Sequence, residues 1–76
     1  SEAERRLMLE ERRKLLAQAI EQLSGKERTV ITLYYYEKLR YSEIADVLNI
    51  SESRVCQIHS KAVEKLRKSM AEYLEQ

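Results

Sequence analysis

The sequence has no proline, phenylalanine or tryptophan, and only one glycine, Gly25, among its 76 residues. Residues that break helices or favour turns are therefore scarce. Charged residues make up 36% of the chain. This composition is typical of a compact all-α domain with little loop. At this length the helices must share one small core, so we expect a single domain over residues 1–76.

Cysteine and histidine occur once each, as Cys56 and His59. Cys56 cannot form an intramolecular disulfide, and no residues with metal-ligand spacing surround it. No serine, cysteine or carboxylate is arranged around His59 as a catalytic triad requires, and there is no glycine-rich phosphate loop. We therefore expect no enzyme activity, no metal and no cofactor.

The chain also lacks an apolar run long enough to span a bilayer, and it has no signal-peptide pattern. These absences favour a cytoplasmic protein with no membrane partner. The sequence starts at Ser1 rather than at an initiator methionine, which suggests a piece of a longer protein.

Residues 40–61 carry the strongest functional pattern, two helices joined by a tight turn. Asn49 tolerates the left-handed conformation that ends a helix, Ile50 is expected to enter the core, and Ser51 has the chemistry of an N-cap. This spacing is that of a helix-turn-helix, placed at 41–60. The first helix, from about residue 42 to 48, shows an apolar stripe of 3.6-residue period formed by Ile44, Ala45, Val47 and Leu48.

The second helix is expected to start near Glu52 and to run past Leu66. Its core side is predicted to carry Val55, Ile58 and Ala62, which lie within about 60° of one another on a helical wheel. The opposite arc is free of apolar side chains and comprises Ser53, Arg54, Gln57, Ser60 and Lys61.

The chemistry of that arc suits the major groove of DNA. Arg54 can donate two hydrogen bonds to guanine, and Gln57 can pair with adenine. Recognition helices use mainly their N-terminal residues for base contacts, so we expect Ser53, Arg54 and Gln57 to read bases and Lys61 to meet a phosphate. Arg40 and the start of the preceding helix are placed to hold another phosphate. An ordinary solvated helix face is the alternative.

The charge distribution agrees with this interpretation. The net charge is only +1, but residues 51–68 contain five basic and two acidic side chains, whereas the two preceding segments, 1–23 and 24–50, are each neutral. Phosphate contacts supply much of DNA affinity. We interpret Cys56 as a small side chain near the DNA backbone, with a redox sensor as the alternative, and His59 as a residue on the flank of the helix.

Two further helices are expected before this motif. Residues 2–22 predict the first, in which residues 1–13 form either a frayed end or a linker. Ser24-Gly25-Lys26-Glu27 matches a capping box and predicts a second helix from about residue 25 to 36. The expected apolar positions are Leu7, Leu15, Leu16, Ala19, Ile20 and Leu23 in the first helix, and Val30, Ile31, Leu33 and Tyr34 in the second.

Two other apolar features follow from spacing. Tyr34, Tyr35 and Tyr36 are consecutive, so at least one should lie at the surface, where it could contact a partner. The last helix continues with an apolar seam longer than the motif needs, which should cover the first helix or a partner. The seam comprises Val63, Leu66, Met70 and Tyr73.

About residues 14–70 resemble region 4, the C-terminal domain of bacterial sigma factors of the sigma-70 family. The resemblance rests on LLAQAIEQLSGKERTVITLYYYE followed by YSEIADVLNISESRVCQIHSKAVEKLR. The segments TLYYYE and SRVCQIHSKA are most similar to the motility and sporulation class of alternative sigma factors. Cys56 and Ser53 differ from the housekeeping pattern, which has a basic and an acidic residue there. These differences imply another −35 preference.

The resemblance implies that the domain recognises the promoter −35 element and docks on the β-subunit flap of core RNA polymerase. It also implies an anti-sigma factor that covers the same surfaces. The DNA-binding residues expected from pattern and resemblance together are Arg40, Tyr41, Ser51, Glu52, Ser53, Arg54, Cys56, Gln57, Ser60 and Lys61. The residues expected to bind the flap or an anti-sigma factor are Leu16, Ile20, Leu33, Tyr34 and Tyr35.

Two alternatives stay open at this point. The first is the DNA-binding domain of a response-regulator-type transcription factor, which shares the four-helix layout and usually acts as a dimer on paired half-sites. The second is a helical interaction module whose outward face never contacts DNA.

Overall fold

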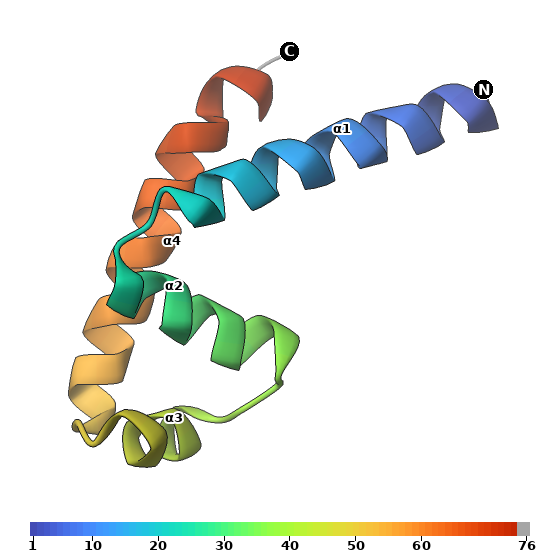
Figure 1. Ribbon diagram of the computed structural model, residues 1–76. Coiled ribbons are helices and arrows are strands. Elements are labelled where there is room, and N and C mark those ends of the chain that lie inside the picture. Colours follow the sequence, from blue (N-terminus) through green and yellow to red (C-terminus); the bar gives the residue numbers. More distant parts are fainter. Residues whose placement is uncertain (75–76) are drawn as a thin grey trace.

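The computed structural model describes residues 1–74, and all of its regular elements are helical. The prediction of an all-α fold with four helices and a helix-turn-helix is confirmed. A short π-helix, η1, adds to the four α-helices. The elements in chain order are α1 (Glu2–Glu21), α2 (Gly25–Ile31), η1 (Thr32–Tyr36), α3 (Tyr41–Leu48) and α4 (Glu52–Leu74) (Figure 1).

The turn between α3 and α4 forms as its residues predict. Asn49 ends α3 in the left-handed conformation, with φ 56° and ψ 48°. The backbone N–H of Ile50 donates to the Ala45 carbonyl at 3.0 Å, and Ile50 packs against the core. The Ser51 hydroxyl accepts from the Arg54 backbone N–H at 3.0 Å, which caps α4. These bonds fix the angle between the two helices of the motif.

The core is made of two neighbouring clusters that share α4. One contains Val30, Ile44, Ala45, Val55 and Ile58, and the other contains Leu23, Ile31 and Ala62. The first half of α4 therefore packs on α2 and α3, while its continuation packs toward α1. Val47, which was expected in the apolar stripe of α3, is 62% exposed, so that prediction is wrong. Its position on the helix turns it away from α4 toward solvent.

Helix α1 is continuous from Glu2 to Glu21. Every residue from Ser1 to Lys14 is nevertheless exposed, and this part of α1 extends beyond the body of the fold (Figure 1). Leu7, expected in the apolar stripe, is 58% exposed, because α4 covers mainly the second half of α1. The expected cover of α1 by the end of α4 is confirmed by buried Met70 and by the Tyr73 hydroxyl, which donates to the Met8 carbonyl at 3.4 Å. None of the described helices is long and apolar enough to cross a membrane.

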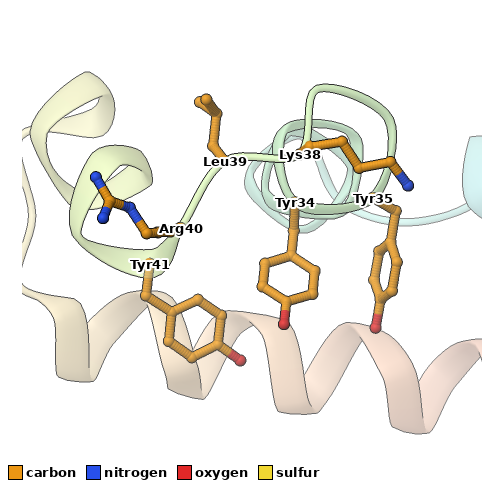
Figure 2. Close-up of a pocket in the computed structure, with 6 residues that line it drawn as sticks. All are labelled: Tyr34, Tyr35, Lys38, Leu39, Arg40 and Tyr41. Carbon is orange, nitrogen blue, oxygen red and sulfur yellow. The ribbon is translucent and has the colours of Figure 1, made fainter.

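The second predicted helix changes geometry halfway. Its α-helical part ends at Ile31, and η1 follows with the Glu37 backbone N–H donating to the Thr32 carbonyl, five residues back, at 3.1 Å. A π turn is wider than an α turn, so successive side chains differ less in direction. Tyr34 and Tyr35 therefore both point toward α4 (Figure 2). Tyr36 is 65% exposed, which agrees with the expectation of a surface tyrosine.

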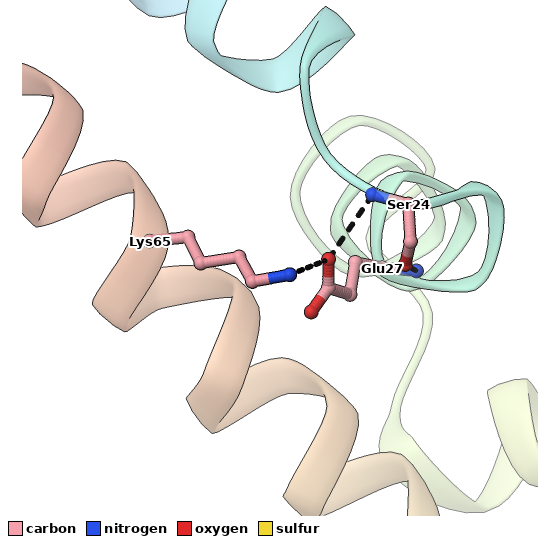
Figure 3. A network of polar contacts seen from close by, with 3 residues as sticks. All are labelled: Ser24, Glu27 and Lys65. Carbon is pink, nitrogen blue, oxygen red and sulfur yellow. Dashed lines mark hydrogen bonds and ion pairs between the residues drawn. The ribbon is translucent and has the colours of Figure 1, made fainter.

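The capping box of α2 also anchors α4. The Ser24 hydroxyl accepts from the Glu27 backbone N–H at 3.3 Å, and a Glu27 carboxylate oxygen accepts from the Ser24 backbone N–H at 3.1 Å. The same oxygen lies 2.9 Å from the Lys65 ammonium nitrogen (Figure 3). The hydrogen bond from Lys65 lowers the pKa of buried Glu27 against the opposing effect of burial. Glu27 thus joins two helices at 38 residues' separation.

Replacing Glu27 by glutamine should isolate the charge, because glutamine also serves in a capping box. At neutral pH we expect a loss of about 1 kcal/mol, since Lys65 is about half exposed and solvent screens the pair. The lowered pKa stabilises the fold above the usual value of 4.5 and this contribution disappears as the pH falls through the folded value. The difference between wild type and variant in urea unfolding should therefore shrink in acid.

The matched control is Glu64→Gln, which breaks an exposed pair with Lys68 on the same helix. It should cost no more than about 0.5 kcal/mol at neutral pH, because both partners are exposed. An equal effect of both substitutions, or a Glu27→Gln difference that persists in acid, would refute this role for the buried pair.

Candidate nucleic-acid interface

The outward face of α4 is open to solvent, as predicted. Val55, Ile58 and Ala62 are buried, which fixes the rotation of the helix about its axis. The opposite arc is exposed at every one of its positions, Ser53, Arg54, Gln57, Ser60 and Lys61. Ser51, Glu52 and Cys56, also expected near DNA, are exposed at the same end of the helix. The structure therefore presents a polar and basic helix surface, supported by a packed core directly behind it.

The start of α3 differs from its expected arrangement. One carboxylate oxygen of Glu43 accepts from the Arg40 backbone N–H at 2.9 Å and from Arg40 Nε at 3.2 Å. These bonds lower the pKa of Glu43. The guanidinium remains largely exposed, but a neighbouring carboxylate already occupies the first N–H of the helix start. A phosphate here would have to bind the outer side of Arg40.

Tyr41 is half-buried, and its ring points toward α4 rather than outward (Figure 2). Its hydroxyl is hydrogen-bonded to His59 Nδ1, and burial raises its pKa. The structure thus assigns Tyr41 to the packing between α3 and α4. Any DNA contact of this residue would come from its backbone or ring edge.

A groove between the start of α2 and α4 was not predicted from the sequence. Lys26 lines this groove together with the basic residues of α4. These residues are far from Lys26 in the sequence, and folding brings them together. The cations in this groove outnumber its one carboxylate, Glu27, which is already paired with Lys65. Lys26 is therefore a further candidate for phosphate contact. The lining residues are Ser24, Gly25, Lys26, Glu27, Arg54, Ile58, Lys61 and Lys65.

His59 is the second feature that the sequence did not reveal. It was interpreted as a flank residue, but the fold surrounds it with Tyr34, Tyr35 and Tyr41. Its Nε2 lies 2.9 Å from the Tyr35 hydroxyl, and its Nδ1 is bonded to Tyr41. Partial burial lowers the pKa of His59. The three tyrosines that contact His59 lie 18 to 25 residues before it in the sequence, so no local pattern predicts these contacts.

An apolar groove runs on another side of the molecule, between α1, η1 and the second half of α4. Leu16, Ile20 and Tyr35, three of the residues expected to bind a partner, line it. Leu33 and Tyr34 do not, because they pack against the first core cluster. The remaining lining residues are Ile31, Tyr36, Lys38, Val63, Leu66, Arg67 and Met70.

Residues 19–68 match the model of the family "Sigma-70, region 4". This match includes α2, η1, α3 and most of α4, and so the whole helix-turn-helix. The chain belongs to the sigma-70 region 4 family.

Individual relatives indicate which class of sigma factor this region 4 resembles. RNA polymerase sigma-D factor of Bacillus subtilis is 48% identical over 64 residues, which cover 84% of the chain and 25% of the relative. RNA polymerase sigma factor FliA of Pseudomonas aeruginosa is 48% identical over 58 residues, 76% of the chain and 24% of the relative. FliA of Escherichia coli K12 is 49% identical over 55 residues, which cover 72% of the chain and 23% of the relative. The predicted resemblance to the motility-type class is confirmed.

The chain spans about a quarter of the length of these relatives. Region 4 as matched begins at Ala19, so the exposed first part of α1 lies outside it. The helix-turn-helix and most of the residues that line the two grooves lie within the matched residues.

Proposed function

We propose that this chain is the promoter-recognition domain of an alternative RNA polymerase sigma factor and that it binds the −35 element. The observation that carries the proposal is the exposed polar and basic face of α4 on a rigid helix-turn-helix within a region 4 domain. The chain would then act as a DNA-binding module, with no catalytic step of its own, in the bacterial cytoplasm at the nucleoid. Residues 1–76 would form one region 4 unit, with the motif at 41–60.

Within this proposal the two ends of the face have different tasks. Ser53, Arg54 and Gln57, in the first two turns of α4, are placed to reach base edges in the major groove. Lys61 lies one turn beyond Gln57 and shares a groove with Lys26, so both are placed to contact the phosphate backbone. Phosphate contacts set the register and base contacts set the sequence preference.

The apolar groove is the proposed docking site for the polymerase β-subunit flap, and an anti-sigma factor would compete for it. Leu16 and Ile20 from α1 and Tyr35 from η1 line it; Leu16 and Tyr35 are exposed, and Ile20 is partly buried. Apolar grooves of this kind accept amphipathic helices. We retain Leu33 and Tyr34 only as residues that shape the wall from behind, since they pack inward.

Selection of bound duplexes from a random DNA pool tests the proposal for DNA. A sigma domain should enrich one asymmetric site that a single α4 can read. Enrichment of a palindrome with two half-sites would instead favour the response-regulator-type alternative. If no sequence is enriched and the face of α4 tolerates every substitution, the chain is a helical interaction module.

Lys61→Ala should weaken binding to all duplexes by a similar factor and reduce the slope of log affinity against log salt by about one unit. The reason is that a phosphate contact releases one condensed counterion regardless of sequence. Fluorescence anisotropy at several salt concentrations measures the slope. Lys14→Ala, which removes an exposed cation from α1, is the matched control and should leave the slope unchanged. An unaltered slope for Lys61→Ala would contradict the phosphate contact.

A further inference from the structure

His59 joins three helical elements through its two ring nitrogens. It projects from α4, its Nε2 lies 2.9 Å from the hydroxyl of Tyr35 in η1, and its Nδ1 is bonded to the hydroxyl of Tyr41 in α3. A neutral imidazole donates from one nitrogen and accepts at the other, and a tyrosine hydroxyl can do either. A neutral His59 can therefore form both hydrogen bonds at the same time.

The ring is also held by its aromatic neighbours. The centroid of Tyr34 lies 4.7 Å from that of His59, and the centroids of Tyr35 and Tyr41 each lie 5.5 Å away. Tyr34 also packs edge-on to Tyr35 at 4.8 Å. Figure 2 shows the three tyrosine rings side by side, all pointing toward α4. Close packing from several sides leaves the imidazole little freedom to rotate. A shift of one ring therefore requires the neighbouring rings to move as well.

Tyr35 takes part in two surfaces. Its hydroxyl bonds to His59, while its ring, 44% exposed, lines the apolar groove beside Leu16 and Ile20. A molecule that fills the groove must touch this ring. On the other side of His59, Tyr41 is the first residue of α3, and Gln57 and Ser60 of the DNA-reading face lie within two residues of His59 on α4.

We propose that His59 is a positioning residue that links Tyr35, in the wall of the apolar groove, to Tyr41 at the start of the helix-turn-helix, so that filling the groove changes DNA affinity. The inference rests on the proposed function for its two ligands, an apolar helix in the groove and duplex DNA on α4. A groove ligand that favours one position of Tyr35 favours one arrangement of His59 and Tyr41. By linkage, DNA must then alter the affinity for the groove ligand by the same factor.

The variant Tyr35→Phe removes only the hydroxyl and keeps the ring in the groove wall. Tyr36→Phe is the matched control, because Tyr36 is the next residue, lines the same groove and is more exposed. His59→Phe removes both hydrogen bonds while keeping a ring among the tyrosines. If the link runs through His59, combining Tyr35→Phe with His59→Phe should reduce the coupling between groove ligand and DNA no more than His59→Phe alone.

The first measurement is nuclear magnetic resonance of the free chain. Tyr35→Phe should shift the ring-nitrogen signals of His59 and the amide signal of Tyr41, and Tyr36→Phe should shift neither. Unchanged signals in Tyr35→Phe, or equal shifts in both variants, would overturn the link. A variant that loses dispersion of its spectrum throughout is unfolded, and the comparison then rests on the remaining variants.

The second measurement is the affinity for the selected duplex with and without a saturating isolated β-flap fragment. In wild type and Tyr36→Phe we expect the fragment to change DNA affinity by about fivefold or more. In Tyr35→Phe and His59→Phe the ratio should fall toward one. The same ratio in all four proteins would overturn the coupling. A chain that binds neither duplex nor fragment would instead overturn the proposed function, and the resonance shifts alone would then decide whether the structural link exists.

Discussion

Replacing Ile44 by alanine should destabilise the domain by about 2–5 kcal/mol. Ile44 is fully buried in the first core cluster, where it holds α3 against α4. Truncation removes apolar contacts and leaves a cavity that the neighbouring side chains Val30 and Val55 cannot fill without moving. A domain of 76 residues buries little surface and has little stability in reserve, so a large share of the molecules should be unfolded at room temperature.

Urea unfolding followed by circular dichroism measures this effect. Val47→Ala is the matched control, since Val47 lies on the same helix but is 62% exposed. Its substitution should change the unfolding free energy by no more than about 0.5 kcal/mol. Similar losses for both variants would mean that α3 does not pack on α4 through Ile44 and would contradict the arrangement of the helix-turn-helix.

Arg54→Ala should cost about 1–3 kcal/mol of discrimination at one base pair of the selected site, if Arg54 donates two hydrogen bonds to guanine. The side chain is exposed in the first turn of α4, and the backbone N–H of Arg54 already donates to the Ser51 hydroxyl. The substitution should therefore leave the fold intact and change DNA binding alone. Binding to a panel of duplexes, each with one changed base pair, locates the position that loses its preference.

Arg54→Lys separates charge from geometry, because lysine keeps the positive charge but lacks the planar fork of the guanidinium. If Arg54 reads a base, the lysine variant should lose the preference at that position almost as fully as the alanine variant. If the lysine variant binds like wild type, and the alanine variant weakens all duplexes equally, Arg54 contacts a phosphate and not a base.

The local features of the fold could be predicted because each depends on a few neighbouring residues. The capping box at Ser24 and Glu27 and the cap at Ser51 form from side chains within three residues of the backbone groups that they satisfy. The left-handed conformation at Asn49 depends on the backbone tolerance of that one residue. The rotation of α4 also followed from spacing alone, since Val55 and Ile58 are buried.

The features that depend on tertiary contacts could not be predicted in this way. Val47 and Leu7 fit apolar periodicities, but no element covers them, and periodicity does not tell where a covering helix ends. No side-chain cap marks the start of the π turn at Thr32–Tyr36, so the local sequence does not predict it. This turn directs Tyr34 and Tyr35 toward His59. Partners that meet across such sequence separations become visible only in the folded chain.

The site shows the same division. The exposed arc of α4 was predicted correctly as a surface, because one helix contains it entirely. Lys26 was not among the predicted residues, because α2 contributes it to a groove whose other wall is α4. Leu33, predicted to bind a partner, packs against the first core cluster and does not line the groove, and only the relative position of η1 and the core decides which side it faces.

The most direct test of the central proposal is a footprint of core RNA polymerase carrying a hybrid sigma factor in which this chain replaces region 4. We expect the hybrid polymerase to protect one asymmetric −35 site. Replacing both Arg54 and Gln57 by alanine should abolish this protection although the hybrid still binds core polymerase. Equal protection with and without the double substitution would show that the outward face of α4 does not recognise the promoter and would contradict the proposed function.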